Sequence, residues 1–234
     1  MGKRKPSTGR RRDPSRPGPG RPTREQAERR SRELLENALD LFLERGFERT
    51  TMEAVAASVG MAKRTVYAKH GDKMRLFKAA LKWAIDAWIV PVERLRAAES
   101  EDLEETLHRI GRILVDNMLT PLGLKLLRIT NAEARRFPEI SAYTYREGTG
   151  PTIAYLADLF TRKLGALDDP EGAALAFLNL VVGRVANASA WGVALTPEEV
   201  ARHTEQSVRL FLHGLRGEAA RTAARSTSRL AGRR

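Results

Sequence analysis

Apolar residues recur at helical spacing along most of the chain between residues 23 and 215, and no stretch alternates apolar and polar positions as a strand does. The first stripe consists of Leu34, Leu35, Ala38, Leu39 and Phe42. Residues three and four positions apart share one face of a helix, which is buried by packing against a neighbour. The pattern therefore predicts an all-α fold.

Start and stop signals divide this pattern into about nine helices. Three segments have the sequence of a capping box, in which side chains satisfy the free N–H groups of a helix start: 23–26, 50–53 and 196–199. Glycines at positions 46 and 60 end the first two helices. We expect helices near residues 23–46, 50–60, 62–69, 72–88, 103–118, 121–136, 138–163, 170–193 and 197–215, with a kink of the seventh at Gly148 and Pro151.

The chain of 234 residues carries a formal net charge of +12, and this charge is unevenly distributed. Residues 1–32 hold 12 basic and 3 acidic residues, residues 216–234 hold 6 and 1, and residues 33–215 hold 23 and 25. Both ends lack the apolar residues that would offset the entropy of ordering, so we expect a disordered basic arm at 1–22 and a flexible basic tail at 216–234. Within the body, residues 45–82 carry 9 basic and 3 acidic residues. Such basic segments favour a polyanion as partner.

Residues 50–69 indicate how a polyanion would be bound. Two short helical segments joined by a tight turn at Gly60 are typical of a helix-turn-helix, whose second helix enters the major groove of DNA. Ala62 and Val66 remain to pack the second helix inward. Its outer surface is expected to present a dense set of hydrogen-bond donors, namely Lys63, Arg64, Thr65, Tyr67 and Lys69.

The residue types exclude several other functions. The chain has no Cys and 4 His, which excludes disulfides, thiolate catalysis and zinc sites built on Cys. It has no Gly-rich phosphate loop and no helical pair of metal ligands. We therefore predict no enzyme activity, no catalytic residues, no metal and no cofactor. No apolar run approaches the ~18 residues that span a bilayer, so a membrane partner is not expected.

One alternative is a DNA-compacting protein whose two basic ends bind any duplex through its phosphates. This alternative predicts equal affinity for all DNA sequences and a strong loss of binding when the ends are removed. A sequence-reading protein would keep its preference when trimmed to residues 22–215.

Residues 25–80 resemble the DNA-binding domain of the tetracycline repressor (TetR) family of bacterial transcription regulators. The resemblance rests on Gly46-Phe47, the Thr50-Thr51-x-x-x-Val55-Ala56 run, Gly60, Thr65-Val66-Tyr67 and the closing Asp72-Lys73-x-x-Leu76-Phe77. One departure is Lys69-His70, where the family often has His followed by an aromatic residue. Residues 131–140 are also similar to a C-terminal segment found in one branch of the family.

The resemblance implies a domain organisation and a function. A helix-turn-helix DNA-binding domain of three helices would occupy residues 23–80, and a helical effector-binding and dimerisation domain would occupy residues 81–215. The homodimer would form through helices 170–193 and 197–215, the second of which offers Val200, Thr204, Val208, Phe211 and Leu215 at helical spacing. Such a protein is most often a repressor that binds a palindromic double-stranded operator and is released by a small-molecule effector. It would act in the bacterial cytoplasm, associated with the nucleoid when bound to DNA.

The resemblance also implies roles for single residues. Thr51, Tyr67 and Lys73 would contact phosphate groups. Arg64 and Thr65 would lie nearest the base edges, with Arg64 suited to bidentate contact with guanine. Lys63 and Lys69 would reach either backbone or base.

The basic arm offers a second DNA contact through Arg16, Arg21 and Arg24. The Gly-Arg-Pro at 20–22 loosely resembles the core of minor-groove AT-hook segments. The arm either enters the minor groove or anchors phosphates without sequence preference.

Candidates for an effector pocket are aromatic and polar residues inside the helical stripes. We predict the set Trp83, Trp88, His108, Arg112, Asn131 and Tyr143, with ordinary packing or surface exposure as the alternative for each one. His108 and Arg112 are one helical turn apart. If both face one cavity, that cavity would favour an anionic or polar ligand.

Overall fold

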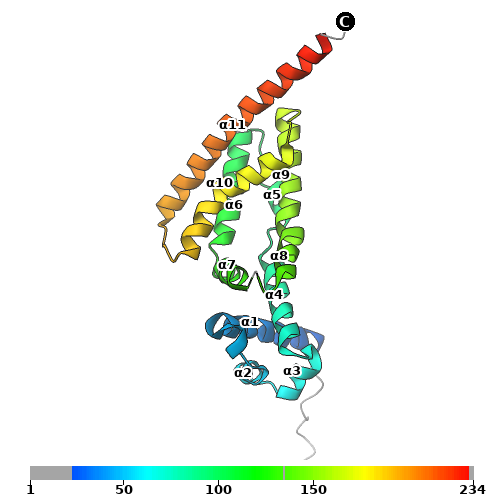
Figure 1. Cartoon of the computed structure of the whole chain (residues 1–234). Coiled ribbons are helices and arrows are strands. Elements are labelled where there is room, and N and C mark those ends of the chain that lie inside the picture. The colour runs from blue at the N-terminus through cyan, green and yellow to red at the C-terminus, as the bar shows by residue number, and fades with distance from the viewer. Residues whose placement is uncertain (1–22, 134, 232–234) are drawn as a thin grey trace, which may run out of the picture.

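The computed structural model describes residues 23–133 and 135–231, which contain α-helices, one π-helical segment and no strand (Figure 1). The all-α prediction is confirmed. The elements are α1 (Arg24–Arg49), α2 (Met52–Ser58), α3 (Lys63–His70), α4 (Lys73–Trp88), α5 (Val92–Arg96), α6 (Leu103–Met118), α7 (Pro121–Glu133), α8 (Pro138–Thr144), the π segment (Tyr145–Thr149), α9 (Gly150–Leu164), α10 (Pro170–Ala190) and α11 (Pro197–Ala231).

The molecule is elongated, with α1, α2 and α3 forming a head at one end (Figure 1). Helix α4 rises from this head into the body, where α6, α9, α10 and α11 pack together. Helices α7 and α8 lie between the two parts, next to α1 and α4. The C-terminal part of α11 projects beyond the body at the opposite end from α3.

The nine predicted helices are all present in the described residues. The seventh predicted helix, 138–163, forms α8, the π segment and α9 in direct succession. Helix α5 is an additional short helix that the apolar pattern did not predict. Helix α11 continues to Ala231, so the predicted helix end at residue 215 is corrected. The predicted arm at 1–22 lies outside the described residues.

The capping signals are confirmed at Thr23 and Thr196, where hydroxyl and side-chain acceptor bond reciprocally to backbone N–H groups. The box predicted to start at Thr50 is wrong. The Thr50 side chain is buried and its hydroxyl donates to the carbonyls of Leu41 (3.0 Å) and Gly46 (2.9 Å), so it serves the end of α1. Thr51 is the residue that caps α2, because its hydroxyl accepts the N–H of Ala54 at 3.1 Å.

The kink predicted near Pro151 takes the form of the π segment. The N–H of Gly150 bonds to the carbonyl of Tyr145, five residues earlier, in place of the usual four. Pro151 has no N–H to donate, and in an unbroken α-helix its ring would clash with the carbonyl of Glu147. The wider turn removes that clash while the helix continues.

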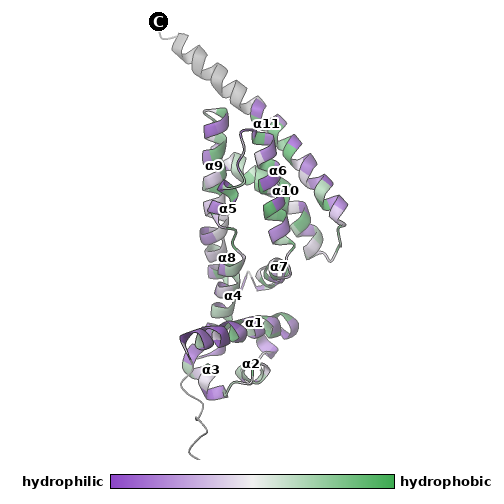
Figure 2. Ribbon diagram, turned by 180° about the vertical axis from the view of Figure 1, so that it is seen from behind, coloured by the Kyte–Doolittle hydropathy of each residue, from purple (hydrophilic) through white to green (hydrophobic). Residues whose placement is uncertain are grey.

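The buried side chains form two separate cores. The head core contains the buried apolar residues of α1 to α4 together with Leu126, Ile129, Phe137 and Ile140. The bundle core contains those of α5, α6, α9, α10 and α11. Figure 2 shows hydrophobic positions concentrated in α10 and hydrophilic ones along α1. Helices α7 and α8 therefore contribute their buried residues to the head core, although they follow α6 in the chain.

Helix α10 is more apolar than the absence of a long unbroken apolar run in the sequence suggested. Among the described helices it alone has the length and mean hydropathy of a membrane-crossing helix, with 21 residues and a mean hydropathy of 1.4 in its most apolar window. Its residues Phe177, Val181 and Val185 are fully buried in the bundle core, whereas Leu175 and Leu180 are 45% and 40% exposed. The apolar character of α10 is thus used for packing on one side and left uncovered on the other.

Candidate nucleic-acid interface

The turn between α2 and α3 sets the two helices against each other. Gly60 adopts a φ of +61°, which a side chain would disfavour, and the next N–H, that of Met61, bonds back to the carbonyl of Ala56 at 2.9 Å. Val55 and Ala56 of α2 and Val66 of α3 are buried in the head core. These three side chains hold the pair of helices in the arrangement expected of a helix-turn-helix.

Helix α3 presents almost its whole surface to solvent at the tip of the molecule (Figure 1). Val66 is its one buried residue, and His70 is half-buried at its end. The five predicted donors all belong to this short helix and are all exposed: Lys63, Arg64, Thr65, Tyr67 and Lys69. Thr51, at the start of α2, is exposed as well.

Lys63 has partners within the protein. Its amine forms an ion pair with Glu53 of α2 and lies 5.4 Å from the centre of the Tyr67 ring. The hydrogen bond from Lys63 holds the pKa of the Glu53 carboxyl below its usual value. A phosphate that bound Lys63 would compete with this carboxylate for the N–H donors of the ammonium group.

Lys73 differs most from its expected role. Its amine donates to the carbonyls of Phe47 (2.9 Å) and Glu48 (3.0 Å) and lies 4.5 Å from the centre of the Phe47 ring. These carbonyls belong to the last turn of α1, so Lys73 ties the start of α4 to the end of α1. The apolar pattern and the motifs gave no sign of this contact, which joins residues far apart in the chain.

The arm residues are described in part. Arg24, the first residue of α1, is exposed and pairs with Glu28 at 2.9 Å. Arg16 and Arg21 lie outside the described residues.

An aromatic cluster and several ion pairs join α7 and α8 to the head. The Phe137 ring lies 5.6 Å from Phe47 and 4.9 Å from Phe77, centre to centre. Arg136 lies 4.5 Å from the centre of the Phe47 ring, and its hydrogen bond lowers the pKa of Glu48. Two further ion pairs cross the same boundary: Asp40 of α1 with Lys125 of α7, and Lys78 of α4 with Glu139 of α8.

The predicted effector residues do not form one site. Trp83 is partly buried against the head core and Asn131 is exposed on α7. The Tyr143 hydroxyl bonds to Asp86 and accepts from Lys82 in a surface network between α4 and α8. Among the described residues these three line neither of the two cavities considered below, whereas Trp88, His108 and Arg112 divide between them.

The first cavity, of about 280 Å³, lies where α4, α6, the π segment, α9 and α10 meet, and Trp88 lines it. The second, of about 920 Å³, lies between α6 and α11, and His108 and Arg112 both line it as their spacing predicted. Its wall also carries three carboxylates, those of Glu105, Asp116 and Glu205. These acids offset the charges of Arg109 and Arg112, so of the expected anionic or polar ligand only the polar one is compatible with this wall.

Two family models match separate parts of the chain. The model described as "Bacterial regulatory proteins, tetR family" matches residues 34–80, and the model described as "AefR-like transcriptional repressor, C-terminal domain" matches residues 105–214. The chain belongs to the TetR family. It is accordingly a non-enzymatic, DNA-binding transcription regulator, and its C-terminal part is similar to the C-terminal domain of AefR-like repressors.

Relatives of this TetR-family chain agree with that assignment. It is 29% identical to the uncharacterized HTH-type transcriptional regulator YezE of Bacillus subtilis, over 56% of this chain and 68% of YezE. The solved structure of the "Flavonoid-responsive Regulator FrrA" is 30% identical, with a TM-score of 0.62 over 80% of this chain and 97% of FrrA. A TetR-family regulator from Mesorhizobium loti is 26% identical, with a TM-score of 0.67 over 80% and 97% of the two chains.

Proposed function

We propose that this TetR-family regulator binds a palindromic operator as a homodimer in the bacterial cytoplasm and leaves it when a small-molecule effector binds. The exposed face of α3 carries the proposal, because a helix with one fully buried residue and a row of donors is built to contact another molecule. The match to an AefR-like repressor domain supports repression. The similarity to FrrA, whose name describes it as flavonoid-responsive, supports an effector.

In this proposal Arg64 and Thr65 contact base edges in the major groove. Thr51, Tyr67 and Lys69 contact phosphates on either side. Lys63 also contacts a phosphate, which competes with Glu53 for its ammonium group. Lys73 acts by positioning α1 against α4. The arm residues Arg16, Arg21 and Arg24 add affinity through the DNA backbone or the minor groove.

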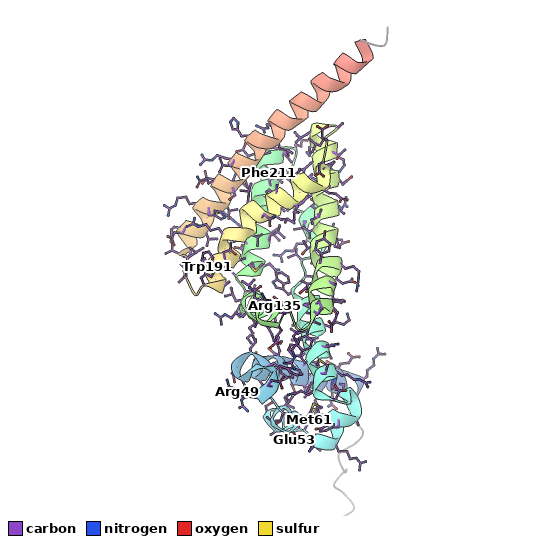
Figure 3. The ribbon with its side chains drawn as sticks, viewed as in Figure 1. Arg49, Glu53, Met61, Arg135, Trp191 and Phe211 are labelled. Carbon is purple, nitrogen blue, oxygen red and sulfur yellow. The ribbon has the colours of Figure 1, made fainter. Side chains whose placement is uncertain are left out.

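The uncovered apolar residues of the last two helices support a dimer. Leu180 of α10 and Leu210 of α11 are 40% and 60% exposed, and a second copy of the chain is the partner that would cover them. The apolar stripe of α11 that suggested dimerisation in the sequence is instead buried within the subunit, at Val200, Thr204, Val208, Phe211 and Leu215. Figure 3 places Trp191 at the outer edge, where α10 turns into α11, and this side chain is 78% exposed.

A dimer explains how an effector would release DNA. The two α3 helices must enter successive major grooves about 34–36 Å apart. Each α3 is joined through α4 to the body, so a change in the body alters this spacing. A ligand that binds better to a wrongly spaced dimer lowers the affinity for the operator.

Selection of bound fragments from random DNA with the full-length protein tests the proposal. We expect a motif with two-fold symmetry. Arg64→Ala should weaken binding to that motif by about 1–3 kcal/mol and relax the preference at one position in each half-site. Arg94→Ala is the charge-matched control, because Arg94 is exposed on α5 in the body. An asymmetric motif, or equal losses for the two variants, would contradict the proposal.

A further inference from the structure

The smaller cavity lies at the seam between the two cores. Trp88, Ile89 and Val90 enter it from the end of α4, and Asn117 enters it from the end of α6. The π segment and α10 complete the wall. Of these elements, α4 belongs largely to the head core, whereas α6 and α10 belong to the bundle core. A molecule in this cavity therefore touches both parts of the protein.

The wall of this cavity carries no charged side chain among the described residues, and most of it is aliphatic or aromatic. Its polar groups are Asn117, Thr149, Thr152 and Asn179. Within the described part of the chain, the Asn117 amide bonds to Trp88 and the Thr152 hydroxyl to Gly148, whereas Thr149 and Asn179 have no side-chain hydrogen bond. Two polar groups thus remain for a ligand, in a site where an ionised group would lose its hydration without finding a counter-ion.

We infer that this cavity binds an uncharged, largely apolar molecule with one or two hydrogen-bonding groups, and that this molecule is the effector. The inference rests on the proposed function in one respect, namely that ligand binding changes DNA affinity. The volume of about 280 Å³ lies near the lower end of the range for ligand pockets, roughly 300–1,000 Å³, so the molecule is small.

The larger cavity fits this role less well. Its lining residues come from α6, α11 and the segments next to them, and none belongs to α1, α2, α3 or α4 in the described chain. It also carries opposite charges side by side, such as the ion pair of Arg109 with Glu105. A ligand there would lie within the bundle and away from the head.

Trp88 connects the smaller cavity to the head. Its indole N–H donates to the carbonyl of Asn117 at 3.1 Å, and the Asn117 amide donates to the carbonyl of Trp88 at 2.9 Å. Helix α7 packs against this pair at Gly123, where a Cβ would lie 2.8 Å from the indole nitrogen and 2.5 Å from the carbonyl of Met118. No space is left on that side, so a ligand that displaces the indole must move α4 or α7. Both helices contribute to the head core, and the movement therefore reaches the head.

A pair of fluorescent probes tests the charge preference. N-phenyl-1-naphthylamine is uncharged, and 8-anilino-1-naphthalenesulfonate has the same rings with an added sulfonate. We expect the full-length protein to bind the uncharged probe at one site per subunit and the sulfonate at least tenfold more weakly. Equal or tighter binding of the sulfonate, or no binding of the uncharged probe, would overturn the inference.

Filling the cavity tests its location. Gly183 of α10 lines it, and a Cβ there would meet no atom within 4 Å, so Gly183→Leu fills the cavity while favouring the helix. We expect at least tenfold weaker binding of the uncharged probe, with unchanged circular dichroism and oligomeric state. Gly214→Leu is the matched control, because it makes the same change at an exposed position of α11 outside the cavity. Asn179→Asp, which adds a charge at an exposed position of the rim, should also weaken binding of the uncharged probe.

Two results separate this inference from the proposed function. If Gly183→Leu binds the uncharged probe as wild type does, while Ala201→Leu in the larger cavity loses it, the site is wrongly assigned. Operator affinity is then measured with and without the probe by fluorescence anisotropy. Cavity binding that leaves operator affinity unchanged supports the ligand class and the site, and contradicts release by a ligand there.

Discussion

Replacing Lys73 by Met separates the two roles that the sequence and the structure give to this residue. Methionine keeps a long flexible stem and removes the ammonium group. The change removes two hydrogen bonds to the carbonyls of Phe47 and Glu48 and the contact of the cation with the Phe47 ring. A residue that only bound phosphate would lose none of these in the free protein.

The expected loss of stability follows from these contacts. A hydrogen bond from a charged group contributes about 1.5–3 kcal/mol, and we take ~1 kcal/mol for each bond here because the chain at Glu48 is exposed and water replaces part of the interaction. The contact between ammonium and ring adds ~0.5–1 kcal/mol. Lys73→Met should therefore lower the free energy of unfolding by about 2.5–3 kcal/mol.

Urea denaturation followed by circular dichroism measures this loss, and operator binding at several salt concentrations measures the phosphate contacts. We expect Lys73→Met to leave the slope of log affinity against log salt unchanged. Lys69→Met is the control, since Lys69 is exposed on α3: its slope should fall by about 0.9 per half-site, with stability within ~0.5 kcal/mol of wild type. Wild-type stability of Lys73→Met together with a reduced slope would refute the positioning role.

Three further predictions concern other positions. Burial lowers the pKa of His70 below 6.5, and its Nε2 is buried without a partner in the described chain, so the folded state loses stability as the pH falls below 6.5. His70→Phe should remove this loss and be more stable than wild type by about 1 kcal/mol. Urea denaturation should show this difference in the free energy of unfolding growing as the pH falls from 7.5 to 5.5, and a difference that does not change with pH would contradict the prediction. Gly123→Ala should cost about 1–3 kcal/mol by overpacking, whereas Gly214→Ala should cost nothing in the same denaturation assay. The hydrogen bond from Arg162 lowers the pKa of Glu99, so its stabilisation is present above pH 4.5 and is lost as the pH falls further; thermal unfolding of Glu99→Gln should approach that of wild type at acid pH, and a gap independent of pH would count against the pair.

Helix starts were predictable from the sequence because their partners lie close by. Thr23 and Thr196 bond to groups three residues away, and Asp72 and Asp169 cap α4 and α10 in the same way. The same local rule failed at Thr50, where two neighbouring threonines were equally suitable and burial decided between them.

Contacts between distant segments were not predictable. The bond from Lys73 to Phe47 spans 26 positions, and the Arg136 contacts join segments still farther apart. Helical spacing correctly placed His108 and Arg112 on one cavity. It gave no information on Glu205, which α11 brings to the opposite wall and which changes the charge of that cavity.

The π segment has a consequence for the register of the helices on either side of it. A π turn holds one residue more than an α turn, and one residue corresponds to a rotation of about 100° around the helix axis. The π turn therefore shifts the register of α9 relative to α8, and in this register Ile140 packs in the head core and Ile153 in the bundle core. Deleting a single residue within 145–149 would rotate α9 by about 100° relative to α8, so Ile140 and Ile153 could not both keep their places in the two cores.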